Sequence, residues 1–165
     1  MAERTPRVMI LHAPGTNRDR DAALACTLAG GAPEVVPIND LLSGVREFAA
    51  YQMLVLPGGF SYGDDLGAGR LWANDLTHRF SRDLDAFIAA GKPVIGICNG
   101  FQTLTRTGLL PGALGHNAQG RFECRWVQIA PETSGVSLWT RGLTQPIHCP
   151  IAHGEGRYVH PDIDG

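Results

Sequence analysis

The sequence predicts an α/β protein built on a parallel sheet with helices on both faces. Up to residue 107, short apolar runs alternate with segments of helical periodicity, which is the rhythm of strand–helix–strand units. The apolar runs do not alternate with polar residues, as is typical of strands buried on both faces of a sheet. The length of 165 residues, with 44% apolar and 18% charged residues, suits a packed core. We therefore expect one domain over residues 1–165.

The order of the elements follows from runs of strand formers, from apolar residues at helical spacing and from the turn residues between them. Four parallel strands are expected over residues 7–12, 34–38, 52–56 and 93–97. Four helices are expected over residues 18–28, 41–50, 71–90 and 99–107. Gly30 and Gly91 end the first and third helices, and Asn39 or Asp40 can cap the second.

The pattern changes after Gly108. Residues 121–129 alternate like a half-exposed strand, and residues 147–151 form a short apolar run. The stretch between them is polar and rich in turn residues. This part predicts antiparallel strands or a long excursion added to the α/β core.

Composition excludes several classes of function. Fourteen basic and 16 acidic residues give a net charge of −2, which argues against a dedicated binder of nucleic acid or anionic membranes. The apolar runs are too short to span a bilayer, and the start of the chain lacks the apolar stretch of an export signal. We therefore expect a cytoplasmic protein with free thiols. No metal site is expected, because no pair of its four cysteines has C-x-x-C spacing and the adjacent Asp64 and Asp65 read as a solvated turn.

The segment Gly96-Ile97-Cys98-Asn99-Gly100 carries the strongest chemical signal. It reads G-x-C-x-G between a predicted strand and a predicted helix, the thiol counterpart of a nucleophile elbow. Glycines on both sides suit a turn with no room for Cβ atoms. A cysteine at the start of a helix also lies where the helix dipole favours the reactive thiolate. Although most cysteines are simply buried, this context predicts that Cys98 is a catalytic nucleophile.

A glycine-rich loop follows the third strand, with Gly58 and Gly59 at its start. Glycines let the backbone approach a ligand and direct amide groups toward it. A thiolate that attacks an amide carbonyl creates an oxyanion that needs such donors, and we expect the backbone amides of Gly59 and Asn99 to supply them. A plain turn or a phosphate-binding loop would have the same glycines, so this loop alone leaves three readings open.

The same segments carry a family resemblance that covers nearly the whole chain. LPGGFSYGDDLGAG, GKPVIGICNGFQTLTRTGLLPG, NAQGRFECRWV and PIAHGEGRY resemble the glutaminase subunits of phosphoribosylformylglycinamidine synthases, a branch of the class I glutamine amidotransferases. The resemblance implies a flavodoxin-like fold with an incomplete C-terminal part.

The resemblance also implies a reaction. Cys98 would attack the carboxamide of L-glutamine and form a thioester, and the ammonia would pass to a synthetase subunit for purine biosynthesis. Gly58, Gly59, Asn99 and Gln102 would bind the substrate or its oxyanion. A small bridging subunit is a further expected partner, whereas nucleic acid and membranes are not. No cofactor is expected in this subunit, because ATP and magnesium would be used by the synthetase.

One part of the family pattern has no match in the sequence. The family places a catalytic His-x-Glu pair in a segment like M-P-H-P-E-R, and no such segment occurs before Gly165. We therefore expect a chain truncated at its C-terminus. His153 and Glu155 have the same spacing, but with Arg157 they belong to the separate H-G-E-G-R signature, for which we expect a partner-facing or supporting role. The alternatives are a catalytically incomplete docking domain and a flavodoxin-like binder of a small ligand.

Overall fold

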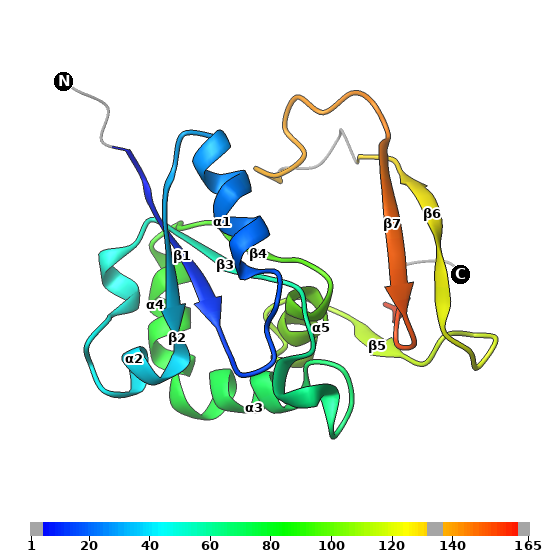
Figure 1. Cartoon of the computed structure of the whole chain (residues 1–165), viewed down its shortest axis with the longest axis horizontal. Helices are drawn as coiled ribbons and strands as arrows, with labels where there is room; N and C mark the ends of the chain where they lie inside the picture. The colour runs from blue at the N-terminus through cyan, green and yellow to red at the C-terminus, as the bar shows by residue number, and fades with distance from the viewer. Residues whose placement is uncertain (1–4, 132–136, 162–165) are drawn as a thin grey trace. The chain divides into compact units, whose positions relative to one another are not determined.

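The computed structural model describes residues 5–131 and 137–161, and the chain divides into two compact units, residues 1–113 and 114–165. The parallel strands lie in the first unit (Figure 1). Its strands are β1 (Arg7–His12), β2 (Ala32–Pro37), β3 (Met53–Leu56) and β4 (Val94–Gly96). Its helices are α1 (Asp19–Leu28), α2 (Ile38–Leu42), η1 (Phe48–Ala50), η2 (Ser61–Asp64), α3 (Arg70–Arg79), α4 (Ser81–Ala89) and α5 (Asn99–Arg106).

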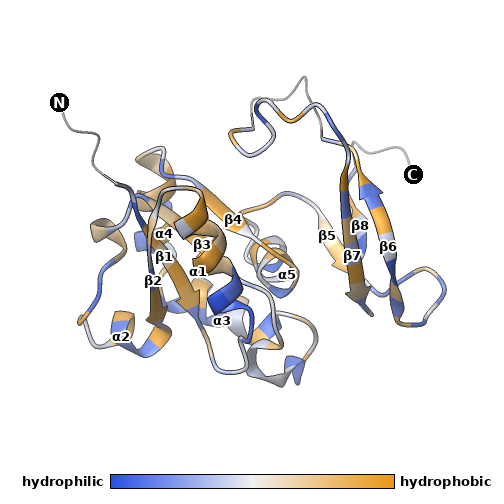
Figure 2. Cartoon of the chain, turned by 45° about the horizontal axis from the view of Figure 1, so that its top comes forward, coloured by the Kyte–Doolittle hydropathy of each residue, from blue (hydrophilic) through white to orange (hydrophobic). Residues whose placement is uncertain are grey.

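The first unit confirms the predicted α/β class. Its four strands are parallel in the order β2-β1-β3-β4, the order of a flavodoxin-like sheet. One face packs its larger apolar cluster against α2, α3, α4 and α5, and the other face packs Val8, Ile10 and Val55 against Ala22 of α1. Figure 2 shows β1 and β3 coloured as hydrophobic, as expected for strands covered on both sides.

Two of the predicted helices are wrong in extent. The helix expected over residues 41–50 is the short α2, which already begins at Ile38, followed by the turn η1. It ends because Gly44 has a φ of 72°, which a continuing helix does not allow. The helix expected over residues 71–90 is interrupted at Phe80, whose φ of −127° is not helical. Phe80 is 5% exposed and its ring lies 5.7 Å from that of Phe48, so core packing overrides the local helical pattern.

The second unit contains the antiparallel strands that the sequence predicts. Strands β6 (Glu123–Ile129) and β7 (Ile147–His153) pair antiparallel along their whole length. The sequence did not predict the short pair β5 (Ala113–Gly115) and β8 (Arg157–Val159), because three residues are too few to show a period. Within the described residues, no helix has the length and apolar character needed to cross a membrane.

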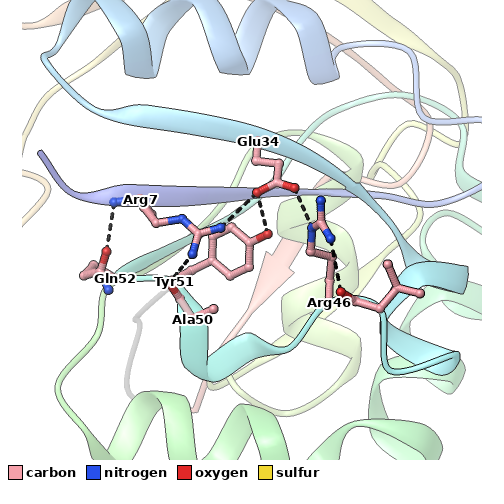
Figure 3. A network of polar contacts seen from close by, with 7 residues as sticks. Arg7, Glu34, Arg46, Ala50, Tyr51 and Gln52 are labelled. Carbon is pink, nitrogen blue, oxygen red and sulfur yellow. Dashed lines mark hydrogen bonds and ion pairs between the residues drawn. The ribbon is translucent and has the colours of Figure 1, made fainter.

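A polar cluster ties the first strands of the sheet to η1 (Figure 3). The Glu34 carboxylate of β2 accepts hydrogen bonds from Arg46 Nε (2.6 Å), the Tyr51 hydroxyl (2.8 Å) and Arg7 Nη2 (3.1 Å). The hydrogen bond from Arg46, followed by that from Tyr51, lowers the pKa of Glu34 below its usual value. Burial and the hydrogen bond to Glu34 raise the pKa of Tyr51 to about 12.

These pKa shifts predict how the cluster contributes to stability. Because the pKa of Glu34 is lower in the folded chain, its contribution is present above pH 4.5, the usual value, and is lost as the pH falls through the lowered value. Glu34→Gln is therefore expected to lower the free energy of unfolding by about 1 kcal/mol at pH 7, a value discounted for partial exposure. Urea unfolding between pH 3 and 7 measures both effects. The exposed Glu47 has no ion pair in the described structure, and an equal change for Glu47→Gln would contradict the prediction.

Candidate functional site

Cys98 lies at the junction of β4 and α5, as the elbow pattern predicts. The residue is exposed, and its backbone has φ 54° and ψ −111°, a conformation that L-residues rarely adopt. Such backbone strain costs about 1–3 kcal/mol and persists where the surrounding structure enforces it. The Cys98 carbonyl accepts the hydrogen bond of Gln102 N at 3.0 Å, so α5 begins immediately after the cysteine. The thiol is therefore presented outward at the positive end of a helix.

The packing of the elbow explains its two glycines. A Cβ atom on Gly96 would lie 2.5 Å from Gly100 O, and one on Gly100 would lie 2.0 Å from Leu56 O. Both distances are far shorter than a van der Waals contact. The prediction that neither position has room for a Cβ atom is confirmed. This close approach seats the first turn of α5 on the carboxyl end of β3.

The same packing brings Cys98 to the glycine-rich loop. A Cβ atom on Gly58 would lie 3.3 Å from the Cβ atom of Cys98. Gly59 follows with a φ of 146°. In the part of the chain that the structure describes, neither the Gly59 amide nor the Asn99 amide donates a hydrogen bond. Two unpaired backbone donors thus accompany an exposed thiol at the carboxyl edge of the sheet, where parallel sheets bind ligands.

A second loop supports the glycine-rich loop from the side of β1. Phe60 N donates to Gly15 O at 3.1 Å, and Tyr62 N donates to Pro14 O at 2.6 Å. Thr16 forms an antiparallel bridge with Gly59. Because these contacts use the amides of Phe60 and Tyr62, those two groups are not available to bind a phosphate.

Gln102 lies on α5 beneath the elbow. Its side chain is 9% exposed, and its Oε1 accepts a hydrogen bond from Asn99 Nδ2 at 3.3 Å. Asn99 is itself 1% exposed. Sequence reasoning did not anticipate that its side chain also contacts Ser61 and Asp64 of the glycine-rich loop. The clustering of Ser and Asp with glycines in that loop was the available signal.

His153, Glu155 and Arg157 lie in the second unit, at the end of β7, in the turn that follows it and at the start of β8. The imidazole of His153 is held by Asn117, which the sequence analysis did not single out. Asn117 Nδ2 donates to the carbonyls of Arg121 and His153, at 2.9 and 2.8 Å. Its Oδ1 accepts the Gly156 amide at 3.1 Å. Since that oxygen is an acceptor, His153 Nδ1 donates the hydrogen bond that joins the two at 2.9 Å.

Among the residues that the structure describes, no group of three or more metal-binding side chains occurs. The adjacent residues Asp64 and Asp65 differ in their contacts. Asp64 accepts hydrogen bonds from Asn99 and Gly69, whereas Asp65 is exposed. Asp64 is therefore a structural acceptor of the loop, and the expectation of a merely solvated turn is wrong for that residue.

Comparison with known proteins places the chain in a family. The CobB/CobQ-like glutamine amidotransferase domain matches residues 5–164. The chain belongs to this family. Subunit PurQ of phosphoribosylformylglycinamidine synthase from Treponema denticola is 50% identical to it over 93% of the chain, and the Dehalococcoides mccartyi subunit is 43% identical over 93%. The chain spans 64% and 63% of the length of these two relatives.

A solved structure shows the same fold. A chain in the structure of PurLQS from Thermotoga maritima matches with a TM-score of 0.80 and 37% identity. The match covers 96% of this chain and 71% of that chain. The predicted resemblance and the amidotransferase-like α/β fold are thereby confirmed. The family domain spans both compact units, while a single folding domain stays a prediction.

Proposed function

We propose that this glutamine amidotransferase domain is the glutaminase component of a phosphoribosylformylglycinamidine synthase. The observation that carries the proposal is the exposed Cys98 on its strained elbow, beside a glycine-rich loop with an unpaired amide. The PurQ relatives, at 40–50% identity over most of the chain, support the assignment to this synthase. The reaction is hydrolysis of the glutamine side-chain amide, coupled to use of the ammonia by a synthetase.

The proposed chemistry begins with attack of the Cys98 sulfur on the carboxamide carbon of L-glutamine. The carbonyl oxygen becomes an oxyanion, for which the amides of Gly59 and Asn99 are the donors. Collapse of this intermediate breaks the C–N bond and releases ammonia, which takes up the proton lost by the thiol. Water then hydrolyses the glutamyl thioester to glutamate and restores the thiol. No segment of the 165 residues matches the M-P-H-P-E-R pattern, and we assign the proton acceptor to no residue of this sequence.

The remaining predicted site residues take supporting roles in the proposal. Gly58 packs against Cys98 without a side chain and so leaves the approach to the sulfur open. Gln102 acts on the substrate through Asn99, because its side-chain oxygen is bonded to the Asn99 amide group. His153, Glu155 and Arg157 lie where β7 ends and β8 begins on the second unit, and for this segment we propose a partner-facing role.

The proposed partners are a synthetase subunit and a small bridging subunit, and the match to a chain of PurLQS supports both. We propose no cofactor in this component, with ATP and magnesium bound by the synthetase. Neither nucleic acid nor a membrane is a proposed partner, in agreement with the net charge of −2. The cytoplasm is the proposed location.

A glutamine analogue with an electrophilic diazoketone in place of the amide tests the proposal. The complete gene product is expected to react with it once per chain, and peptide mass spectrometry should find the adduct on Cys98. Excess L-glutamine should slow the labelling at least about tenfold, because substrate and analogue compete for one site. Labelling of Cys124 instead, which is also exposed, or labelling insensitive to glutamine, would contradict the proposal.

A further inference from the structure

The side chain of Asn99 is fully hydrogen-bonded although the residue lies beside an exposed nucleophile. Its Oδ1 accepts from the backbone amide of Ser61 at 3.2 Å and from the Ser61 hydroxyl. Its Nδ2 donates to Asp64 Oδ1 at 2.9 Å and to Gln102 Oε1 at 3.3 Å. A carboxamide has two acceptor and two donor positions, and all four are occupied here. This arrangement leaves the side chain a single orientation.

The glycine-rich loop is held to α5 at more than one point. Asp64 Oδ1 also accepts the Gly69 amide at 3.1 Å, which closes the loop on itself. Gly69 in turn lies so close to α5 that a Cβ atom there would be 2.6 Å from Thr103 Oγ1. Asp64 thus joins the end of the loop to Asn99, while Ser61 joins its beginning.

The residues with strained backbone conformations lie at or next to these contacts. In residues 5–131 and 137–161, the non-glycine residues with positive φ are Tyr62, Asp64 and Cys98. Two of them lie in the loop and the third is the proposed nucleophile. The Tyr62 hydroxyl is anchored by Asp75 at 2.6 Å. Strained residues persist where several contacts enforce them, so the loop and the elbow are set by the bonds that join them.

We propose that Ser61 and Asp64 are positioning residues that set the distance between the Gly59 and Asn99 amides by fixing the Asn99 side chain. This inference rests on the proposed function, since it assigns both amides to the same oxyanion. Gly59 precedes Ser61 by two residues, and the other amide belongs to Asn99 itself. The contact between Ser61 and Asn99 is therefore a direct link between the two donors that does not pass through Cys98.

Variants of Asp64 in the complete gene product, assayed with the synthetase, separate positioning from stability. Asp64→Gly removes the carboxylate but suits the positive φ of 53°, and it is expected to lower kcat about 10–100-fold with KM within threefold of wild type. Asp64→Asn keeps an oxygen that can accept both N–H groups and is expected to retain kcat within about threefold. Asp65→Asn, at the exposed neighbour, is the matched control and should match wild type.

The rate of alkylation by iodoacetamide separates the two roles. If Asp64 were needed only for the structure around Cys98, its loss would change this rate as well as kcat. This displacement forms no oxyanion, so the Asp64→Gly variant should alkylate Cys98 at the wild-type rate while its glutaminase kcat falls. Should Asp64→Gly fail to fold, Ser61→Ala decides the question: it keeps the Ser61 amide, loses the hydroxyl bond and should lower kcat about three- to tenfold. The inference is overturned by an unchanged kcat in these variants, by equal losses of alkylation and kcat, or by equal losses in Asp64→Asn and Asp64→Gly. A Cys98→Ala enzyme with wild-type activity would instead overturn the proposed function.

Discussion

Replacement of Cys98 by alanine is expected to lower glutamate release by at least about 10,000-fold, because the variant has no nucleophile for thioester formation. The two unpaired amides remain in place and could still polarise a carbonyl, which accounts for any residual hydrolysis. The fold should persist, since alanine, like cysteine, has a Cβ atom and is under similar backbone strain at a φ of 54°. The measurement is glutamate release by the complete gene product with the synthetase present.

Two controls make this result specific. Cys124→Ala, which changes another exposed free thiol on β6, should leave glutamate release within about twofold of wild type. Ammonium supplied in place of glutamine should restore the ammonia-consuming reaction of the proposed synthetase partner in the Cys98→Ala enzyme, because that reaction then needs no glutaminase. Glutamate release near the wild-type rate in Cys98→Ala would show that another group attacks glutamine.

The fold was predictable from the sequence wherever the local pattern of a segment agreed with the packing of that segment in the folded chain. The apolar run at residues 7–12 is β1 with the same bounds, and the segment 99–107 became α5 with one residue fewer. The prediction of one long helix over residues 71–90 was wrong, because no glycine or proline in that segment signals the break between α3 and α4. The break arises when the Phe80 side chain enters the core beside Phe48, a contact across 32 residues that local periodicity does not register.

For the candidate site, the sequence indicated the proposed nucleophile and the glycines beside it, but not the contacts that hold them in place. The glycines of an elbow can be read from spacing, since the need for absent Cβ atoms is local. The contacts of Asn99 with Ser61 and Asp64 join residues 38 and 35 positions apart, respectively. They depend on the seating of α5 against β3, which only the folded chain reveals. Asn117 escaped notice for the same reason, because its bond to His153 spans 36 positions.

Gly100→Ala is expected to lower the free energy of unfolding by more than about 3 kcal/mol, at the upper end of overpacking effects. The added Cβ atom would meet the carbonyl oxygen of Leu56 at 2.0 Å and its carbonyl carbon at 2.5 Å. These are backbone atoms of β3, and Leu56 O also accepts the Ile97 amide at 3.0 Å. Relief of the clash would therefore require α5 to move away from the sheet and carry Cys98 away from Gly58.

Alanine substitutions at two other glycines separate the effect of this clash on stability from the effect of backbone conformation. Gly91 has a φ of 71° with no heavy atom within 4 Å of an added Cβ atom, so Gly91→Ala should cost only about 1 kcal/mol through left-handed strain. Gly115 is open and has no positive φ, and Gly115→Ala should change stability by less than about 0.5 kcal/mol. Urea unfolding of the soluble variants measures the series, and loss of soluble protein only in Gly100→Ala agrees with it. A Gly100→Ala protein as stable as Gly91→Ala would mean that α5 is not seated on β3 closely enough to fix the position of the thiol.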